Sequence, residues 1–247
     1  MADPVQVHLV AAGKYHDIDF ARLELLKLFA EEPRIRASVA MSYADLDRLQ
    51  RCAALVTYTC DLVPSPEETV AIRAWLERGG RWLALHGTNS ILRFLASGLV
   101  DSPAERDDVM EILGTQFVAH PPIGPFRVHV EAPDDPLVAG EEDFEVVDEL
   151  YLSRHLAPIT TLLSARFAGE APGFVVSSWP ETRVPILYRR RLGQGEVVYC
   201  TLGHCRSHHD VPELLPFWPH PERCAWNYPV FYRLLRRGLR WAIGALD

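Results

Sequence analysis

Three residues of this chain combine reactive side chains with positions beside apolar segments: His86, His204 and Glu149. His86 and His204 each follow an apolar run that is typical of a buried strand, and Glu149 lies beside Asp148 inside a third apolar stretch. Imidazole can act as a general acid or base near neutral pH, and a carboxylate among histidines can be a base, an orienting group or a metal ligand. We therefore predict that His86, His204 and Glu149 are catalytic.

Four further polar residues also follow apolar segments. His16 and Asp17 follow the first apolar segment of the chain, and Thr88 and Asn89 follow His86. Pockets for small molecules place a few such hydrogen-bonding groups where they fix the orientation of a ligand. We predict that these four residues bind the substrate.

A divalent metal such as zinc is an additional hypothesis for the histidines. His16, His120 and His204 are the candidate ligands, because neutral imidazole is the commonest metal ligand in proteins. They are far apart in the sequence, so no local spacing marks a metal site. A histidine at the end of a strand can equally have a structural role, and the sequence therefore specifies no cofactor.

Well-known catalytic and cofactor signatures are absent from the sequence. It contains no G-x-S-x-G elbow, no P-loop, no H-E-x-x-H and no C-x-x-C pair. The glycines of Gly193-Gln194-Gly195 lack the third glycine of a dinucleotide fingerprint and precede a strand-like run, so they predict a hairpin turn. We therefore expect neither NAD nor a nucleoside triphosphate as a ligand.

The five cysteines are odd in number and scattered, which is typical of thiols in a reducing cytoplasm. Cys60 follows an apolar run and precedes Asp61, so a reactive thiolate is one interpretation. Cysteine is usually buried when it forms no disulfide, and no histidine lies beside this one in the sequence to activate it. The interpretation of Cys60 as a small packing residue is favoured.

Strand-like and helix-like segments alternate through the first half of the chain. The strand-like runs are residues 5–11, 35–40, 53–59 and 81–85. Helices are predicted over residues 20–30, over 44–51 with Ser42 as N-cap, and after the capping sequence that begins at Ser65. Repeated β–α–β units predict a mostly parallel sheet with helices on both faces. Ligands bind beyond the carboxyl ends of such strands, so residues 13–17, 60–61 and 86–90 should lie at the functional edge.

The second half of the chain is less regular. A helix is predicted over residues 90–96, followed by strand candidates and a strand hairpin at residues 114–120, 126–131, 144–152, 160–167, 184–190 and 196–201. Apolar residues at helical spacing predict a last helix over 228–244, with its arginines on the side facing water. The proline-rich stretch 212–229 is predicted to be a long loop that could cover a pocket.

Charge and hydropathy exclude several functional classes. The chain has 25 basic and 33 acidic residues, a net charge of −8, which disfavours binding to a phosphate backbone. No run of about 18 apolar residues is present, and the N-terminal residues lack the basic start of a signal peptide. We expect a cytoplasmic protein that binds neither nucleic acid nor membrane.

Six segments, taken together and in this order, resemble the ThuA-like (trehalose utilisation) family of the class I glutamine amidotransferase-like superfamily. They are GKYHD, LALHGT, GTQFVAHP, DELY, GQGEVVYCTLGH and RGLRWAIG, and they cover nearly the whole chain. The resemblance implies a single ThuA-like domain over residues 1–247. It also implies an α/β fold with a flavodoxin-like, doubly wound sheet.

The resemblance also implies a class of substrate. It points to an enzyme acting on a disaccharide or keto-sugar derivative, such as a hydrolase, isomerase or lyase, with Trp218 and Trp226 stacking on the sugar. The turn that carries the catalytic cysteine of amidotransferases has His86 here, so glutaminase activity is not expected unless a displaced thiol such as Cys60 replaces it. The alternative is a non-catalytic sugar-binding or regulatory module. Members of the family can self-associate, so a homo-oligomer is also open.

Overall fold

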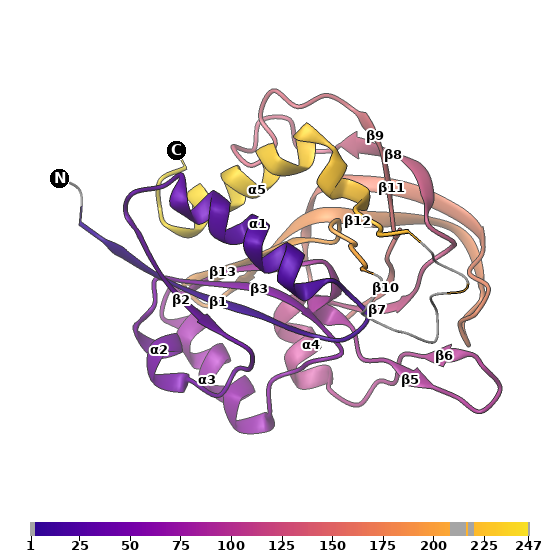
Figure 1. The fold of residues 1–247 in the computed structure, drawn as a ribbon, viewed down its shortest axis with the longest axis horizontal. Coiled ribbons are helices and arrows are strands. Elements are labelled where there is room, and N and C mark those ends of the chain that lie inside the picture. Colours follow the sequence, from indigo (N-terminus) through magenta and orange to yellow (C-terminus); the bar gives the residue numbers. More distant parts are fainter. Residues whose placement is uncertain (1–2, 208–215, 217–219, 247) are drawn as a thin grey trace.

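A large mixed β-sheet forms the centre of the molecule (Figure 1). The computed structural model describes residues 3–207, 216 and 220–246, and within that part of the chain the sheet has nine strands. One half of the sheet is parallel and the other half is antiparallel. The strands of the parallel half are, in order across the sheet, β2 (Ile35–Ala40), β1 (Val5–Gly13), β3 (Ala54–Cys60), β4 (Arg81–Leu85) and β13 (Gly195–Cys200).

The parallel half confirms the prediction of β–α–β units. Its strands lie side by side in the order β2-β1-β3-β4-β13, and each neighbouring pair is parallel. All seven residues of β3 are buried, as expected for a central strand covered on both faces. This half brings the ends of β1, β4 and β13 to one edge.

The antiparallel half shows that the expected mostly parallel sheet is only partly correct. Its strands, again in order across the sheet, are β12 (Ser178–Leu192), β11 (Thr160–Glu170), β8 (Gly124–Val130) and β9 (Phe144–Asp148). The segments that connect these strands contain no helix, and parallel neighbours require a long crossover that is usually helical. Hairpin-like connections therefore give antiparallel pairing.

Helices cover both faces of the parallel half, as the alternating pattern predicts. In Figure 1, α1 (Ile18–Ala30) and α5 (Pro229–Ala242) lie above the sheet. The helices α2 (Leu46–Arg51), α3 (Pro66–Glu77) and α4 (Asp107–Leu113) lie below it. Each layer buries its own apolar cluster against the sheet.

Helix starts follow capping chemistry that the sequence shows only in part. Ser65 and Glu68 form the predicted capping box at the start of α3. Asp45, not Ser42, caps α2, because its carboxylate accepts a hydrogen bond from the backbone N–H of Arg48. Asp17 caps α1 in the same way, so this helix begins two residues earlier than predicted.

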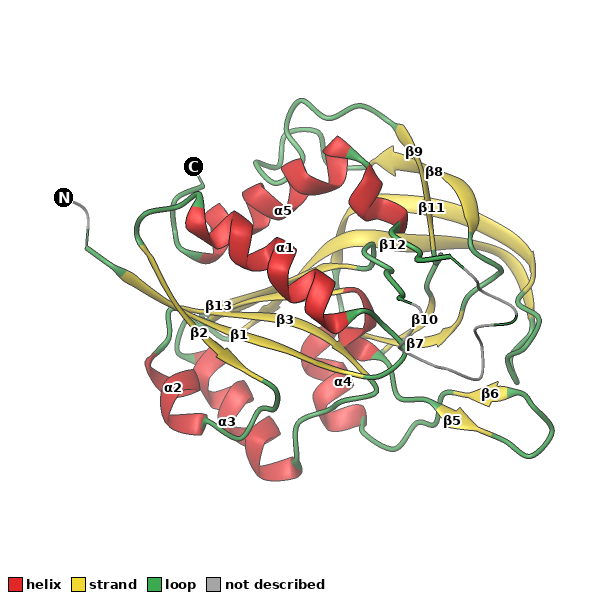
Figure 2. Cartoon of the chain, viewed as in Figure 1, coloured by secondary structure: helices red, strands yellow, loops and turns green. Residues whose placement is uncertain are grey.

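Two predicted elements are wrong. Residues 90–96 do not form a helix; after the short 3-10 helix η1 (His86–Asn89), the chain enters a projecting hairpin of β5 (Arg93–Phe94) and β6 (Val100–Asp101) (Figure 2). The predicted strand 144–152 is broken after β9, and β10 (Leu152–His155) pairs with β7 (Thr115–Ala119) outside the main sheet. The break leaves residues 149–151 between the two sheets.

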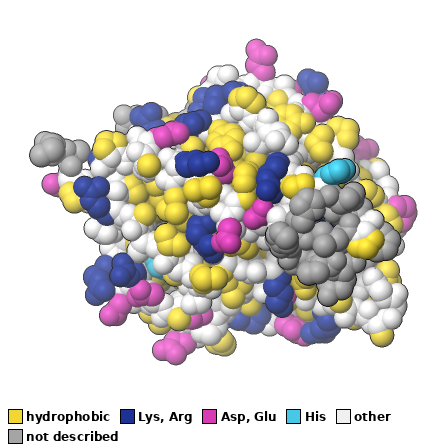
Figure 3. Space-filling model, in the orientation of Figure 1, with side chains coloured by type: hydrophobic (Ala, Val, Ile, Leu, Met, Phe, Trp, Pro, Cys, Tyr) yellow, Lys and Arg dark blue, Asp and Glu magenta, His cyan; other side chains and the backbone are white. Residues whose placement is uncertain are grey.

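Charged side chains of both signs are interspersed over the face formed by α1 and α5 (Figure 3). The arginines of α5 face outward as predicted and pair with acids: Arg233 with Glu141, and Arg236 with Glu31. In the described part of the chain, none of the helices has the length and apolar character needed to cross a bilayer.

Candidate functional site

Four buried side chains from distant parts of the sequence meet at the edge of the sheet. They are His16, His86, Glu149 and His204, and their ligand atoms all lie within 4.8 Å of one another. Three of the four are the residues that we predict to be catalytic, and the fourth was predicted to bind substrate or metal. The sequence therefore predicts a functional role for all four members of this cluster, although it does not predict their arrangement.

The parallel strands explain why the three histidines meet. His16 follows β1, His86 follows β4 and His204 follows β13, and the carboxyl ends of parallel strands lie at the same edge of a sheet. Glu149 reaches this edge from the other half, at the break after β9. The break thus places a carboxylate among histidines that the sheet has already gathered.

The contacts within the cluster are short. The Nε2 atoms of His16 and His86 are 2.8 Å apart, and His86 Nε2 is 3.5 Å from Glu149 Oε2. The other carboxylate oxygen, Oε1, is 3.1 Å from His204 Nδ1. Glu149 therefore bridges two histidines, and a third, His16, contacts His86.

The backbone at His86 is held in a conformation that L-residues rarely adopt. Its φ is 44°, in the left-handed region, and its carbonyl accepts a hydrogen bond from the Tyr199 hydroxyl. A Cβ on the following residue, Gly87, would lie 2.7 Å from the carbonyl oxygen of Thr59, so the turn passes directly against β3. Backbone strain of this kind clusters at functional sites, where the surrounding structure maintains it.

Asp148 organises the loop that carries His204. Its buried carboxylate accepts hydrogen bonds from the backbone N–H groups of Gly203 at 2.8 Å, His204 at 3.1 Å and Ala225 at 3.3 Å. Burial raises the pKa of Asp148. The sequence singles out Asp148 only as a neighbour of Glu149, whereas the structure gives it a separate positioning role.

Burial and mutual contact shift the pKa values within the cluster. Burial, together with His86 and His204, lowers the pKa of His16 well below its ordinary value. Burial also lowers the pKa of His204, but Glu149 and Glu222 outweigh it and raise that pKa to about 9. Burial raises the pKa of Glu149, yet His120 and His204 outweigh burial and hold it well below its usual range. Glu149 is consequently ionised at neutral pH.

Two residues of the site were missed by the sequence analysis. The Tyr151 hydroxyl lies 3.1 Å from His86 Nε2, and the Glu222 carboxylate lies 2.9 Å from His204 Nε2. Tyr151 belongs to the DELY segment and could have been found from its position two residues after Glu149. Glu222 lies in the proline-rich stretch, where no spacing distinguishes it from other acids.

His120, which is predicted to be a metal ligand, lies beside the cluster and not within it. Its Nε2 is 3.4 Å from Glu149 Oε1, but it is not one of the mutually close ligand atoms. The side chain is 23% exposed, whereas those of His86 and His204 are 0% exposed. His120 is therefore the histidine of this site that water reaches most easily.

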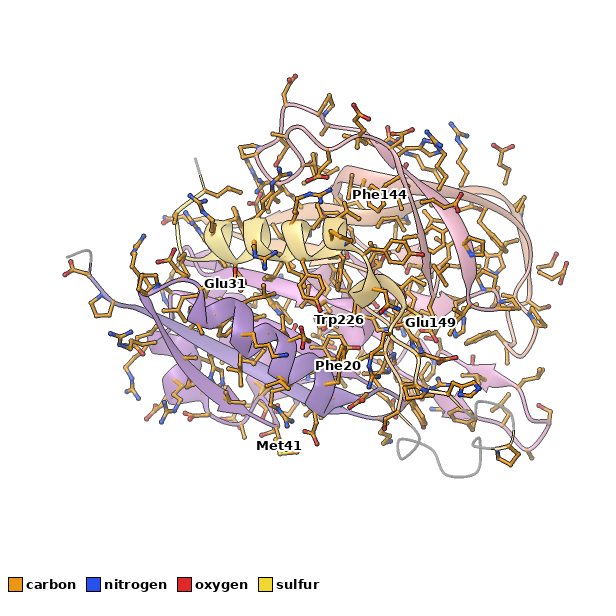
Figure 4. The ribbon with its side chains drawn as sticks, turned by 45° about the horizontal axis from the view of Figure 1, so that its top comes forward. Phe20, Glu31, Met41, Phe144, Glu149 and Trp226 are labelled. Atoms are coloured by element: carbon orange, nitrogen blue, oxygen red, sulfur yellow. The ribbon has the colours of Figure 1, made fainter. Side chains whose placement is uncertain are left out.

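Three residues predicted to bind substrate are buried and make contacts within the protein. Thr88 and Asn89 are buried, and their side chains donate hydrogen bonds to Leu85 O and Thr115 Oγ1. Trp226 is 4% exposed, packs beside Phe20 and donates a hydrogen bond to the carbonyl of Gly203 (Figure 4). All three side chains are buried, and their role in binding substrate stays a prediction.

Two other residues predicted to bind substrate, His16 and Asp17, line a pocket at the surface. A surface pocket of ≈ 470 Å³ is lined by His16 and Asp17, together with Arg22, Met41 and Ser207. The carboxylate of Asp17 also caps α1 and pairs with Arg223 at 2.9 Å. Trp218 lies outside the described residues.

The cysteines do not offer a replacement nucleophile. All five are buried, and burial raises the pKa of the Cys60 thiol well above its ordinary value. A nucleophilic thiol needs the opposite environment, one that favours the thiolate. This supports the interpretation of Cys60 as a packing residue.

Comparison with known proteins decides the family. The model of the ThuA family, described as trehalose utilisation, matches residues 9–217. The chain belongs to the ThuA family. The match covers His16, His86, Glu149 and His204, so the buried cluster lies within the ThuA region, whereas Glu222 lies beyond it. No curated protein matches the chain in sequence.

Solved structures share the fold of this ThuA protein. A ThuA-like protein from Bacteroides uniformis ATCC 8492 has a TM-score of 0.67 and 15% identity, covering 98% of this chain and 93% of that chain. A ThuA-like protein from Parabacteroides merdae ATCC 43184 has a TM-score of 0.66 and 15% identity, covering 99% and 92%. A cytoplasmic protein from Salmonella typhimurium LT2 has a TM-score of 0.55 and 12% identity, covering 96% and 99%. At these identities the likeness shows the fold alone.

Proposed function

We propose that this ThuA protein is an enzyme that acts on a sugar or keto-sugar derivative, with the buried cluster as its reactive centre. The observation that carries the proposal is the convergence of His16, His86, Glu149 and His204 from four separate loops. Burying several ionisable groups is costly, and titratable groups with perturbed pKa values concentrate at functional sites. The sugar class comes from the trehalose utilisation family, which is a family-level analogy.

The geometry suggests a division of roles. His86, His204 and Glu149 contact one another and would form the reactive centre together. His120 lies at the more exposed side, next to the Glu149 carboxylate, and its Nδ1 is 2.7 Å from the Pro121 carbonyl. Because a carbonyl only accepts, Nδ1 carries a proton and Nε2 is left to exchange a proton with a substrate hydroxyl.

Turnover of a panel of disaccharides, their keto derivatives and their phosphates tests this proposal. Once one compound is turned over, His86→Ala, His204→Ala and Glu149→Gln should each lower kcat/KM by about 100-fold or more. His129→Ala is the matched control, because His129 also pairs with a carboxylate, that of Asp143, but is exposed and outside the cluster. If the three cluster variants keep full activity, the proposed reactive centre is wrong.

The second candidate is a non-catalytic sugar-binding or regulatory module. It is favoured by the turn at His86, which lacks the cysteine nucleophile of amidotransferases. A thermal shift with the same panel distinguishes the two, since a ligand at 100 times its Kd stabilises the fold by about 2.7 kcal/mol. Stabilisation without turnover of any compound would support the module.

A further inference from the structure

We infer that His16, His86, His204 and Glu149 form a binding site for one divalent transition metal of the zinc type. The inference deepens the proposed function, because it concerns the same cluster, but it rests on a separate observation. That observation is the hydrogen bond that the outward-facing nitrogen of each imidazole makes, which determines where the ring carries its proton.

The outer contacts of His16 and His86 fix their tautomers. His16 Nδ1 lies 3.1 Å from the carbonyl oxygen of Lys14, and His86 Nδ1 lies 2.9 Å from that of Thr201. A carbonyl oxygen can only accept, so Nδ1 is the protonated nitrogen of both rings. Each ring therefore directs the lone pair of Nε2 into the cluster, where the two Nε2 atoms are 2.8 Å apart.

In His204 the two ring nitrogens have the opposite roles: Nε2 faces outward and Nδ1 faces the cluster. Its Nε2 lies 2.9 Å from the Glu222 carboxylate, which accepts the Nε2 proton. Its Nδ1 faces Glu149 Oε1 at 3.1 Å, is fully buried and has no hydrogen-bond partner among the described residues. Nδ1 therefore donates to the Glu149 carboxylate when the ring is charged, and it offers a third lone pair at the same place when the ring is neutral.

Neutral hydrogen bonding cannot satisfy this arrangement. The Tyr151 hydroxyl, 3.1 Å from His86 Nε2, can donate one proton to one of the three lone pairs. The 2.8 Å contact between the Nε2 atoms of two neutral rings would still be repulsive. The contact between His204 Nδ1 and Glu149 is attractive only while His204 carries a second proton. A metal cation between the ligand atoms would bind the lone pairs of His16 and His86 and would replace the proton on His204 Nδ1.

The outer partners are those that metal-bound histidines use. A metal ligand histidine almost always donates its other N–H to a backbone carbonyl, a carboxylate or water, which fixes the tautomer and the ring. Here the acceptors are the carbonyls of Lys14 and Thr201 and the carboxylate of Glu222, one for each ring. Glu222 is then a positioning residue for His204 and not itself a ligand.

The spacing and chemistry of the donors select the class of metal. Zinc–ligand bonds of about 2.0–2.1 Å in a tetrahedron separate the ligand atoms by about 3.3 Å. Three contacts within the cluster, at 2.8, 3.1 and 3.5 Å, lie around that value. The last two involve different oxygens of Glu149, and the four ligand atoms all lie within 4.8 Å of one another. Three imidazole nitrogens and one carboxylate suit zinc or a neighbouring first-row metal, whereas magnesium and calcium prefer oxygen.

Metal content of the full-length protein tests the inference. The protein is stripped with a chelator, incubated with Zn²⁺, dialysed and measured by inductively coupled plasma mass spectrometry. We expect one zinc per chain for the unaltered protein and for His120→Ala, because His120 lies outside the ligand set. His16→Ala and His204→Ala should retain at least about tenfold less zinc per chain than the unaltered protein. Glu222→Gln should weaken the affinity for zinc by about 10–100-fold.

Spectroscopy and folding controls keep the result interpretable. Co²⁺ in place of zinc should give visible absorption bands that depend on His204 and not on His129, the exposed control. Circular dichroism verifies that each variant is folded. If the ligand variants do not fold, the unaltered protein still tests the metal site, because its unfolding temperature must rise with added Zn²⁺.

Three outcomes overturn the inference. They are no stoichiometric zinc in the unaltered protein, no effect of Zn²⁺ on its stability, or loss of metal from His120→Ala equal to that from His204→Ala. Failure here is distinct from failure of the proposed function. Sugar turnover that needs His86 but no metal would refute only the metal, and stoichiometric zinc without turnover would refute only the enzyme.

Discussion

At the scale of single residues, the site depends on groups that hold others in place. Asp148 is not a member of the cluster, yet its carboxylate accepts hydrogen bonds from four backbone N–H groups, in the segments at residues 149, 203–204 and 225. One of those segments begins with Gly203, whose φ of 125° is a conformation that glycine readily adopts. The position of His204 is therefore set by a carboxylate and a glycine that take no part in chemistry.

Asp148→Ala should lower the free energy of unfolding by about 3 kcal/mol or more, because it leaves buried N–H groups of Gly203, His204 and Ala225 without an acceptor. Urea unfolding measures the change. The control is Asp47→Ala, in which an 88% exposed side chain is removed and a change within about 0.5 kcal/mol is expected. Equal stability of both variants would show that Asp148 does not hold the loop.

At the scale of elements, helix ends and helix attachments position the strands. The start of α3 has a complete capping box at Ser65, whereas the start of α2 depends on Asp45. The helix α5 is attached to the 137–143 segment through Glu141, which pairs with Arg233 at 2.7 Å and Arg237 at 3.2 Å. These contacts determine where each helix lies on the sheet.

Ser65→Ala and Asp45→Ala should each destabilise the protein by about 1 kcal/mol, because each removes the acceptor for a backbone N–H at a helix start. Ser42→Ala should change stability by less than about 0.5 kcal/mol, since Ser42 is not the cap of α2. Chemical denaturation of the three variants measures these changes in the free energy of unfolding. A large effect at Ser42 would restore the capping role that the sequence suggested.

Glu141→Gln should destabilise the protein by about 1 kcal/mol at pH 7 and have little effect below about pH 3. Arg233 lowers the pKa of Glu141 below its ordinary value of 4.5, with a further contribution from Arg237. A carboxyl with a lowered folded pKa stabilises the fold above its unfolded pKa, and this stability is lost as the pH falls through the folded pKa. Thermal unfolding from pH 7 to pH 3 should show the two proteins converging; a constant difference would contradict the ion-pair explanation.

At the scale of the whole molecule, the cluster joins the two halves of the sheet. Its histidines come from the parallel half and its glutamate from the antiparallel half. His16 and His204 are 188 positions apart in the sequence. A ligand that binds all four residues only in the folded state stabilises that state by mass action. The site and the fold are therefore linked thermodynamically.

Removal of metal should consequently lower the stability of the entire protein. With Zn²⁺ at 100 times its Kd, the stabilisation is about 2.7 kcal/mol, or about 5–10 °C in the unfolding temperature of a domain of this size. Differential scanning calorimetry with and without chelator measures it. The same experiment on His204→Ala should show no chelator effect, and a chelator effect of equal size in that variant would place the metal elsewhere.

The sequence already contains the local signals of this fold and most of the reactive residues. The apolar run that becomes β3, the capping box at Ser65 and the final amphipathic helix are recognisable because each depends on neighbouring residues. His86, His204 and Glu149 could be selected because polar groups at the ends of buried strands are unusual. Those inferences need no knowledge of distant contacts.

Tertiary structure alone decided the rest. The antiparallel half of the sheet, the separation of His120 from the ligand set and the outer contacts of Glu222 and Lys14 depend on long-range packing. Which nitrogen of a histidine carries the proton is determined by a hydrogen-bond partner that can lie anywhere in the chain. For that reason the sequence names the side chains of this site, and only the folded chain brings them within 4.8 Å of one another.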